Sequence, residues 1–94
     1  MPTDLYVRGT NCMVKMRDDL RAALGSDYRS VVEPAMNALR TKARLENISA
    51  VKAFERLSWP ALRAHDGLEL SLWSAAIVEL YELRERLFPG RLHG

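Results

Sequence analysis

Apolar residues between positions 68 and 88 recur at spacings of three and four, which predicts a long C-terminal helix stopped by Pro89 and Gly90. One stripe of this helix consists of Leu72, Ala76, Leu80, Leu83 and Leu87. A second stripe lies beside it and consists of Leu70, Trp73, Ile77, Tyr81 and Phe88. Together they cover about half of the circumference, whereas packing on one core needs a band only somewhat over 100° wide. We therefore expect a second packing surface, which belongs either to the rest of the fold or to another chain.

The N-terminal segment predicts one helix after an ambiguous start. Residues 4–8 fit either a short extended arm or a first helical turn, and Gly9 is expected to interrupt either one. Thr10 or Asn11 can cap a helix that runs to about Leu24, where a glycine suits the left-handed residue that ends helices. The apolar stripe of this helix consists of Met13, Met16, Leu20, Ala23 and Leu24.

A second helix is predicted to start between Asp27 and Ser30 and to continue towards Asn47. Ser30 and Glu33 have the spacing of a capping box, in which the two side chains satisfy each other's backbone amides. Pro34 follows immediately, and proline is tolerated only in the first turn of a helix. The apolar stripe of this helix consists of Val32, Met36, Leu39 and Ala43.

A third, shorter helix is predicted over residues 49–58, where the expected buried residues are Val51, Phe54 and Leu57. The Trp-Pro pair at 59–60 is expected to break it, because the residue before a proline is pushed away from helical torsions. The proline then opens a single further turn over 61–65. Asp66 and Glu69 form a second capping box, which starts the last helix.

These patterns predict an all-α fold: a small single-domain helical bundle of about four helices, with one extra short turn and a long C-terminal helix. The domain spans residues 1–94, with 1–10 as a possible flexible arm and 91–94 as a loose tail. A chain of this size buries only about 60–65% of the surface it exposes when unfolded. Its core is therefore modest, and dimerisation is a natural way to enlarge it.

Charge is distributed unevenly along the chain. The net charge is only +2, which by itself implies neither a nucleic acid nor a membrane partner. Residues 35–65 carry six cations and two acids, however, whereas residues 66–86 carry five acids and two cations. The basic middle and the acidic last helix can attract each other within one fold or across a dimer. Alternatively both are solvated faces, whose surface ion pairs contribute only about 0–1 kcal/mol each.

Cysteine usage and hydropathy indicate the compartment. Cys12 is the only cysteine, so the chain cannot form an internal disulfide framework. Its helical position beside Met16 and Ala23 predicts a small, partly buried apolar residue. The N-terminus lacks the pattern of a signal peptide, and no apolar run approaches the length of a membrane span. We expect a cytoplasmic protein without membrane contacts, and the eleven arginines against three lysines are typical of a GC-rich bacterial gene.

The sequence predicts no catalytic site, no metal and no cofactor. His65 and His93 are the only histidines, and no group of histidines, cysteines and carboxylates has the spacing of a zinc site. The Gly-Ser-Asp segment at 25–27 is interpreted as a turn rather than a phosphate-binding loop. An enzyme is therefore the least favoured functional class.

The favoured class is a non-catalytic helical protein–protein interaction module that forms a homodimer. We expect it to regulate another protein, as an adaptor or anti-activator does, by occupying that partner's helical or dimerisation surface. The predicted interface is the second stripe of the last helix, with residues Leu70, Trp73, Ile77, Tyr81, Arg84 and Phe88. One alternative is a transcription regulator that contacts nucleic acid through Arg40, Lys42 and Arg44. Another alternative is a secretion-type chaperone.

Overall fold

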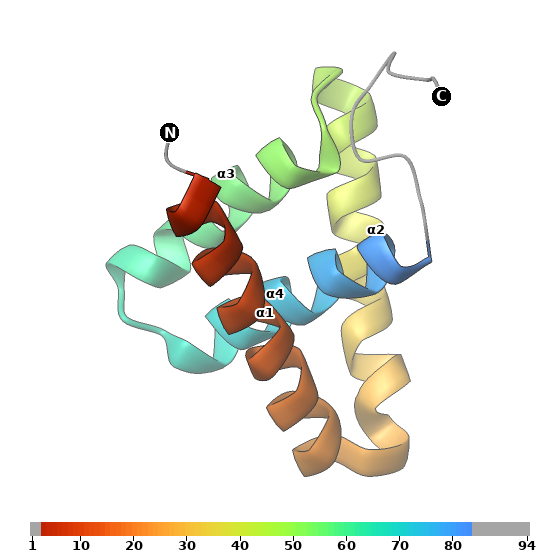
Figure 1. The fold of residues 1–94 in the computed structure, drawn as a ribbon. Helices are drawn as coiled ribbons and strands as arrows, with labels where there is room; N and C mark the ends of the chain where they lie inside the picture. The colour runs from red at the N-terminus through yellow and green to blue at the C-terminus, as the bar shows by residue number, and fades with distance from the viewer. Residues whose placement is uncertain (1–2, 84–94) are drawn as a thin grey trace.

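The computed structural model describes the backbone of residues 3–83 and the side chains of residues 11–83. This part of the chain contains α helices and one 3-10 helix and no strand, so the all-α prediction is confirmed for it. In chain order the elements are α1 (Thr3–Leu24), η1 (Gly25–Asp27), α2 (Tyr28–Glu46), α3 (Ala50–Arg63) and α4 (Gly67–Glu82). α1 and α2 form a hairpin closed by η1, and α4 crosses behind α1 towards α2 (Figure 1).

α4 is the central helix of the fold. It contacts α1, α2 and α3, and every residue from 74 to 80 is buried. A helix that is apolar around most of its circumference is expected in such an interior position. The second packing surface that the sequence demands is therefore supplied by the other helices, which is the first of the two alternatives stated above. The predicted stop at 88–90 and the tail at 91–94 lie outside the described residues.

The other three helices turn one face each towards α4. The predicted stripe of α2 is confirmed, because Val32, Met36 and Leu39 are fully buried and Ala43 packs against them. α1 contributes Leu20 to the core. α3 meets the core mainly through small residues, of which Ala53 is fully buried. Small side chains allow two helix axes to approach closely, which explains how three helices fit around a short α4.

Some predicted core positions are displaced. Val51, Phe54 and Leu57 of α3 are only partly buried at the edge of the core, whereas the alanines beside them are enclosed. In α1, Ala23 is exposed although it lies on the predicted apolar stripe. The periodicity therefore identified the correct side of each helix, but not which residue of that side lies deepest.

The start of α1 differs from the prediction. The helix is continuous from Thr3, so residues 4–8 do not form an extended arm and Gly9 does not interrupt the helix. A glycine inside a helix costs only about 0.5–1 kcal/mol relative to alanine, which a long helix tolerates. Gly25 has a positive φ of 56°, as predicted for the residue that ends α1. The chain then continues into η1, so the extra short turn lies at Gly25–Asp27.

α3 runs through Pro60, so the predicted break at 59–60 and the separate turn at 61–65 are wrong. Proline deprives the carbonyl of Arg56, four residues earlier, of its usual intrahelical partner. Both residues lie on the exposed side of α3, where water can take the place of the missing amide. The helix therefore continues to Arg63, and His65 then adopts a left-handed φ of 56° before α4 begins.

Neither of the two predicted capping boxes forms, although Asp66 caps α4 as predicted. Asp66 accepts a hydrogen bond from the amide of Glu69 at 3.0 Å and caps α4. The carboxylate of Glu69 does not reach back, because it accepts a hydrogen bond from the indole Nε1 of Trp73 at 3.2 Å. Ser30 lies inside α2, where its hydroxyl donates to the carbonyl of Asp27 at 3.0 Å. Pro34 likewise lies within α2, beyond its first turn.

Candidate functional site

α2 carries apolar side chains on two opposite faces. Its inner face belongs to the core, as described above. Its outer face has side chains of five residues at alternating spacings of three and four: Val31, Pro34, Ala38, Thr41 and Leu45. This spacing places them along one line of the helix, which is the pattern of a helix–helix contact seam. We call these five residues the outer stripe.

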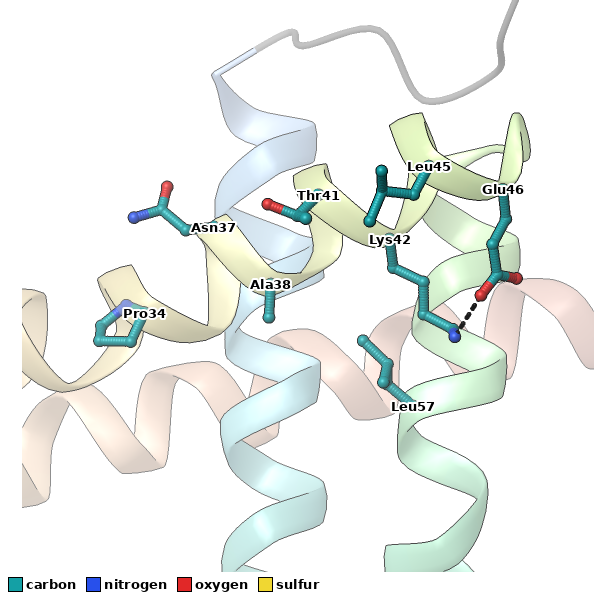
Figure 2. A pocket seen from close by; sticks show the side chains of 8 residues that line it. All are labelled: Pro34, Asn37, Ala38, Thr41, Lys42, Leu45, Glu46 and Leu57. Carbon is teal, nitrogen blue, oxygen red and sulfur yellow. Dashed lines mark hydrogen bonds and ion pairs between the residues drawn. The ribbon is translucent and has the colours of Figure 1, made fainter.

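All members of the outer stripe except Val31 line one wall of an open groove. The groove has a volume of about 450 Å³ and is lined by Pro34, Asn37, Ala38, Thr41, Lys42, Leu45, Glu46 and Leu57. Figure 2 shows that all of these residues except Leu57 come from α2, and that Leu57 reaches the groove from α3. Leu45 is 79% exposed and Val31 is 40% exposed, so large apolar side chains at both ends of the stripe face solvent. Such an unpartnered apolar stripe is a candidate binding surface.

A charged rim borders the groove on the side of α3. Glu46 pairs with Lys42 of its own helix and with Arg56 of α3 (Lys42 and Glu46 are drawn in Figure 2). Hydrogen bonds from Lys42 and then from Arg56 lower the pKa of Glu46 from its ordinary value. These ion pairs connect the end of α2 to α3. They also place charged side chains along one edge of the apolar part of the groove.

The opposite rim carries further charge. Glu33 lies 3.5 Å from Arg40 and 3.8 Å from Arg29, both on α2. Arg44 follows Arg40 by one helical turn and is exposed. The outer stripe therefore lies between two rows of charged residues, as the apolar centre of a protein interface usually does.

A second notable group is a buried charge cluster between α1, α2 and α4. Arg17 of α1 is only 6% exposed and Glu79 of α4 only 5% exposed. Arg17 Nη1 donates to Glu79 Oε2 at 3.2 Å, and the guanidinium binds both oxygens of Glu82 at 2.8 and 3.0 Å. Its Nε also donates to Asp18 at 2.7 Å. These contacts satisfy the buried guanidinium in the way that burial of a charge requires.

Tyr28 completes this cluster from α2. Its hydroxyl donates to Glu79 Oε2 at 2.6 Å, and the guanidinium of Arg21 lies 5.3 Å from the ring centre. Burial, followed by the hydrogen bond to Glu79, raises the pKa of Tyr28. The hydrogen bond between Arg17 and Glu82 raises the pKa of Arg17 and lowers that of Glu82. The cluster joins three helices, and the groups within it are occupied with each other rather than with a substrate.

Among the described residues, the predicted pairing of the basic middle with the last helix is not found within the fold, and its form across a dimer stays a prediction. Acids of the last helix, Glu79 and Glu82, pair with arginines of α1. Cations of the basic middle instead pair with carboxylates of α2 and α3. Lys42 and Lys52 pair with carboxylates three or four residues away, which helix geometry already brings within reach.

The predicted interface of the last helix is divided by the structure. Ile77 is 5% exposed and belongs to the core of the fold, so it offers no surface to a partner. Trp73 packs partly against the same core, Leu70 is partly buried, and Tyr81 is 60% exposed. The two remaining members of the predicted interface, Arg84 and Phe88, lie outside the described residues. The central member of the predicted ridge is thus an interior residue.

The three cations of the nucleic-acid alternative lie on different parts of α2. Lys42 pairs with Glu46, and Arg40 donates to Asn37 at 2.7 Å besides contacting Glu33. Arg44 is exposed. Two of the three are thus engaged with polar or acidic neighbours within the fold.

Other sequence candidates have plain structural positions. Cys12 is exposed, so its predicted partial burial is wrong. His65 is exposed in the link between α3 and α4, and His93 lies outside the described residues. Among the side chains that the structure describes, no three histidines, cysteines or carboxylates are close enough to hold a metal ion. Within the same residues, no helix has the length and apolar character needed to cross a membrane.

Two features of the sequence indicate the outer stripe and the buried charge cluster. The outer stripe has a regular spacing in the sequence, but a proline, an alanine and a threonine stand where large apolar residues usually mark such a stripe. Arg17 follows Met13 by four residues and precedes Leu20 by three, so it falls on the apolar face of α1. An arginine on one apolar face and a glutamate at 79 on another each indicate a buried charge that needs a partner, although the spacing does not say which one.

Comparisons with known proteins give no relative. No family model matches the chain, and neither the curated proteins nor the solved structures contain a significant match.

Proposed function

We propose that this chain is a small, non-catalytic protein–protein interaction module that self-associates and docks through the outer stripe of α2. The observation that carries the proposal is the pair of apolar faces on α2. The inner face is buried in the core, whereas the outer stripe retains a 79% exposed leucine beside an apolar groove. A second helix is the partner that fits such a surface, because knobs at spacings of three and four fill the holes of a facing helix.

Regulation of a partner protein is part of this proposal. A module of this size binds by covering a surface, and an amphipathic groove flanked by charges covers a helix of another protein as readily as a helix of its own copy. Competition between these two occupants would allow self-association to control partner binding. The buried cluster around Arg17 supports this role indirectly, because it joins the first residue of α2, Tyr28, to α1 and α4 and so anchors the helix that carries the outer stripe.

The proposal is tested by two matched leucine substitutions. Leu45 in the groove and Leu68 at the start of α4 are 79% and 74% exposed. Replacing either by Glu should change stability by no more than about 0.5 kcal/mol, because neither is packed in the core. We expect Leu45→Glu to give a monomer by light scattering, since a buried charge opposes docking, while Leu68→Glu keeps the mass of the wild-type dimer.

Helix content by circular dichroism and the thermal midpoint of both variants serve as folding controls. A folded Leu45→Glu protein with the mass of the wild-type dimer would exclude the groove as the association surface. A wild-type protein that remains monomeric at all concentrations tested would refute the self-association itself.

A further inference from the structure

The two ends of the outer stripe of α2 are symmetric about Ala38, and its inner members lie four residues before and three after it. Val31 precedes Ala38 by seven residues and Leu45 follows it by seven. At a rise of about 1.5 Å per residue, each large side chain lies about 10 Å from Ala38 along the helix axis. Two copies of α2 laid antiparallel would therefore bring Val31 of each copy against Leu45 of the other. Ala38 would meet Ala38 at the centre, where small side chains permit close approach.

Two charged residues beside the stripe are nearly symmetric about the same point. Glu33 precedes Ala38 by five residues and Arg44 follows it by six. At about 100° per residue, these two residues lie about 20° apart around the helix and so border the stripe on the same side. An antiparallel pair would place Glu33 opposite Arg44 of the second copy, twice. A parallel pair would place this flank of the two copies on opposite sides of the contact, so Glu33 and Arg44 would not meet.

Both charged groups are accessible for such a contact. The side chain of Glu33 is 43% exposed, although it lies near Arg40 and Arg29 of its own helix. Arg44 is exposed. A second cation approaching Glu33 from another copy would extend an existing charge cluster, and exposed pairs of this kind contribute more to orientation than to affinity.

We propose that the groove is filled by α2 of a second copy of this chain, antiparallel about a two-fold axis near Ala38, with Glu33 of each copy paired to Arg44 of the other. This inference rests on the proposed function and specifies its self-association. The contact is isologous, so it closes as a dimer and leaves no free end from which a filament could grow. Leu57 of α3 lines the same groove and adds an apolar contact from each copy.

The test is a charge-reversal complementation. In a Glu33→Arg protein, two arginine–arginine contacts replace the two proposed pairs, and in an Arg44→Glu protein two glutamate–glutamate contacts do so. We expect each variant alone to self-associate about tenfold more weakly than the wild type by analytical ultracentrifugation. An equimolar mixture of the two variants should recover the wild-type association constant as a heterodimer, because both contacts are then between opposite charges. The double variant should recover it as a homodimer.

Thermal midpoints of all variants control for loss of the intramolecular contacts of Glu33. If the mixture and the double variant associate no more tightly than the single variants, the antiparallel pairing is wrong. If the charge-reversed proteins fail to recover tight association but Leu45→Glu still gives a monomer, the groove remains the interaction surface. Only the antiparallel arrangement of the two copies is then wrong. A wild-type monomer would overturn the inference, and the groove would then serve a different protein.

Discussion

α4 and α2 both carry more apolar surface than one packing contact requires, but they use it differently. α4 lies among three other helices, and its residues 74–80 are all buried. α2 lies at the side of the fold, where one face is in the core and the other retains an exposed leucine beside a groove. Both faces of α2 follow helical spacing, but the inner one is buried, whereas the outer one meets α3 only at the edge of an open groove.

This contrast shows what apolar excess on a helix measures. It measures how many neighbours a helix requires, but not whether those neighbours belong to the same chain. The larger excess on α4 is explained by its central position, whereas the smaller excess on α2 stays partly exposed beside a groove. The more conspicuous pattern is therefore the structural one, whereas the weaker pattern marks the candidate surface.

The largest expected effect distinguishes the two helices directly. Ile77→Glu should unfold the protein, because it places an unpaired carboxylate in the core of a domain whose total stability is about 5–15 kcal/mol. Leu45→Glu should leave the fold intact. Far-UV circular dichroism during urea titration measures both. A folded Ile77→Glu protein with normal stability would show that α4 is not an interior helix.

A second prediction concerns the cluster that holds α4 in place. Arg17→Met should lower the free energy of unfolding by about 3–5 kcal/mol, because it removes the buried cation of Glu79 and leaves only the exposed Arg21, 3.9 Å away. The double variant Arg17→Met, Glu79→Leu should regain much of this loss, since no unpaired buried charge remains between the helices. Denaturant unfolding of both variants makes the comparison. Equal stability of the single variant and the wild type would contradict the assigned burial of Arg17.

Neighbouring residues of α4 provide a finer contrast. Leu80 is 1% exposed and Tyr81 is 60% exposed. Leu80→Ala should cost about 2–5 kcal/mol, the usual range for a large-to-small change in a core. Tyr81→Ala should change stability by no more than about 0.5 kcal/mol. Chemical denaturation of the two variants measures both losses of stability. Similar losses for Leu80→Ala and Tyr81→Ala would contradict the orientation of α4.

The smallest predicted effect is on acid stability. The pKa of Glu82 is lower in the folded protein than its ordinary value of 4.5, because Arg17 donates hydrogen bonds to the ionised form. The unfolded chain therefore binds more protons in this range, so stability should fall as the pH is lowered through 4.5 and below. Glu82→Gln should be less stable near neutral pH and should lose less stability on acidification. Thermal midpoints between neutral and acid pH measure the difference.

Local sequence signals predicted much of the helical organisation. The stripe of α2, the cap at Asp66 and the left-handed Gly25 were each visible because they depend on neighbouring residues only. The course of the chain through Pro60 was not visible, since it depends on the exposure of the carbonyl that loses its amide. The apolar faces were likewise visible before their neighbours were known.

The candidate site was less predictable, because it depends on how the helices pack. The sequence marked α4 as the interaction helix, and only the packing of α1, α2 and α3 around it shows that Ile77 is an interior residue. The contact between Arg17 and Glu79 spans 62 positions of sequence, so no local rule could pair them. The groove required α3 as well, since Leu57 completes a surface that α2 begins.

The central claim is that the outer stripe of α2, rather than α4, carries the association of this protein. The most direct measurement is a dilution series of amide NMR spectra of the wild-type chain. We predict that the signals of Val31, Ala38 and Leu45 shift together as the protein dissociates, while those of Ile77 and Leu80 remain in place. Shifts centred on α4 with an unchanged α2 would contradict this account.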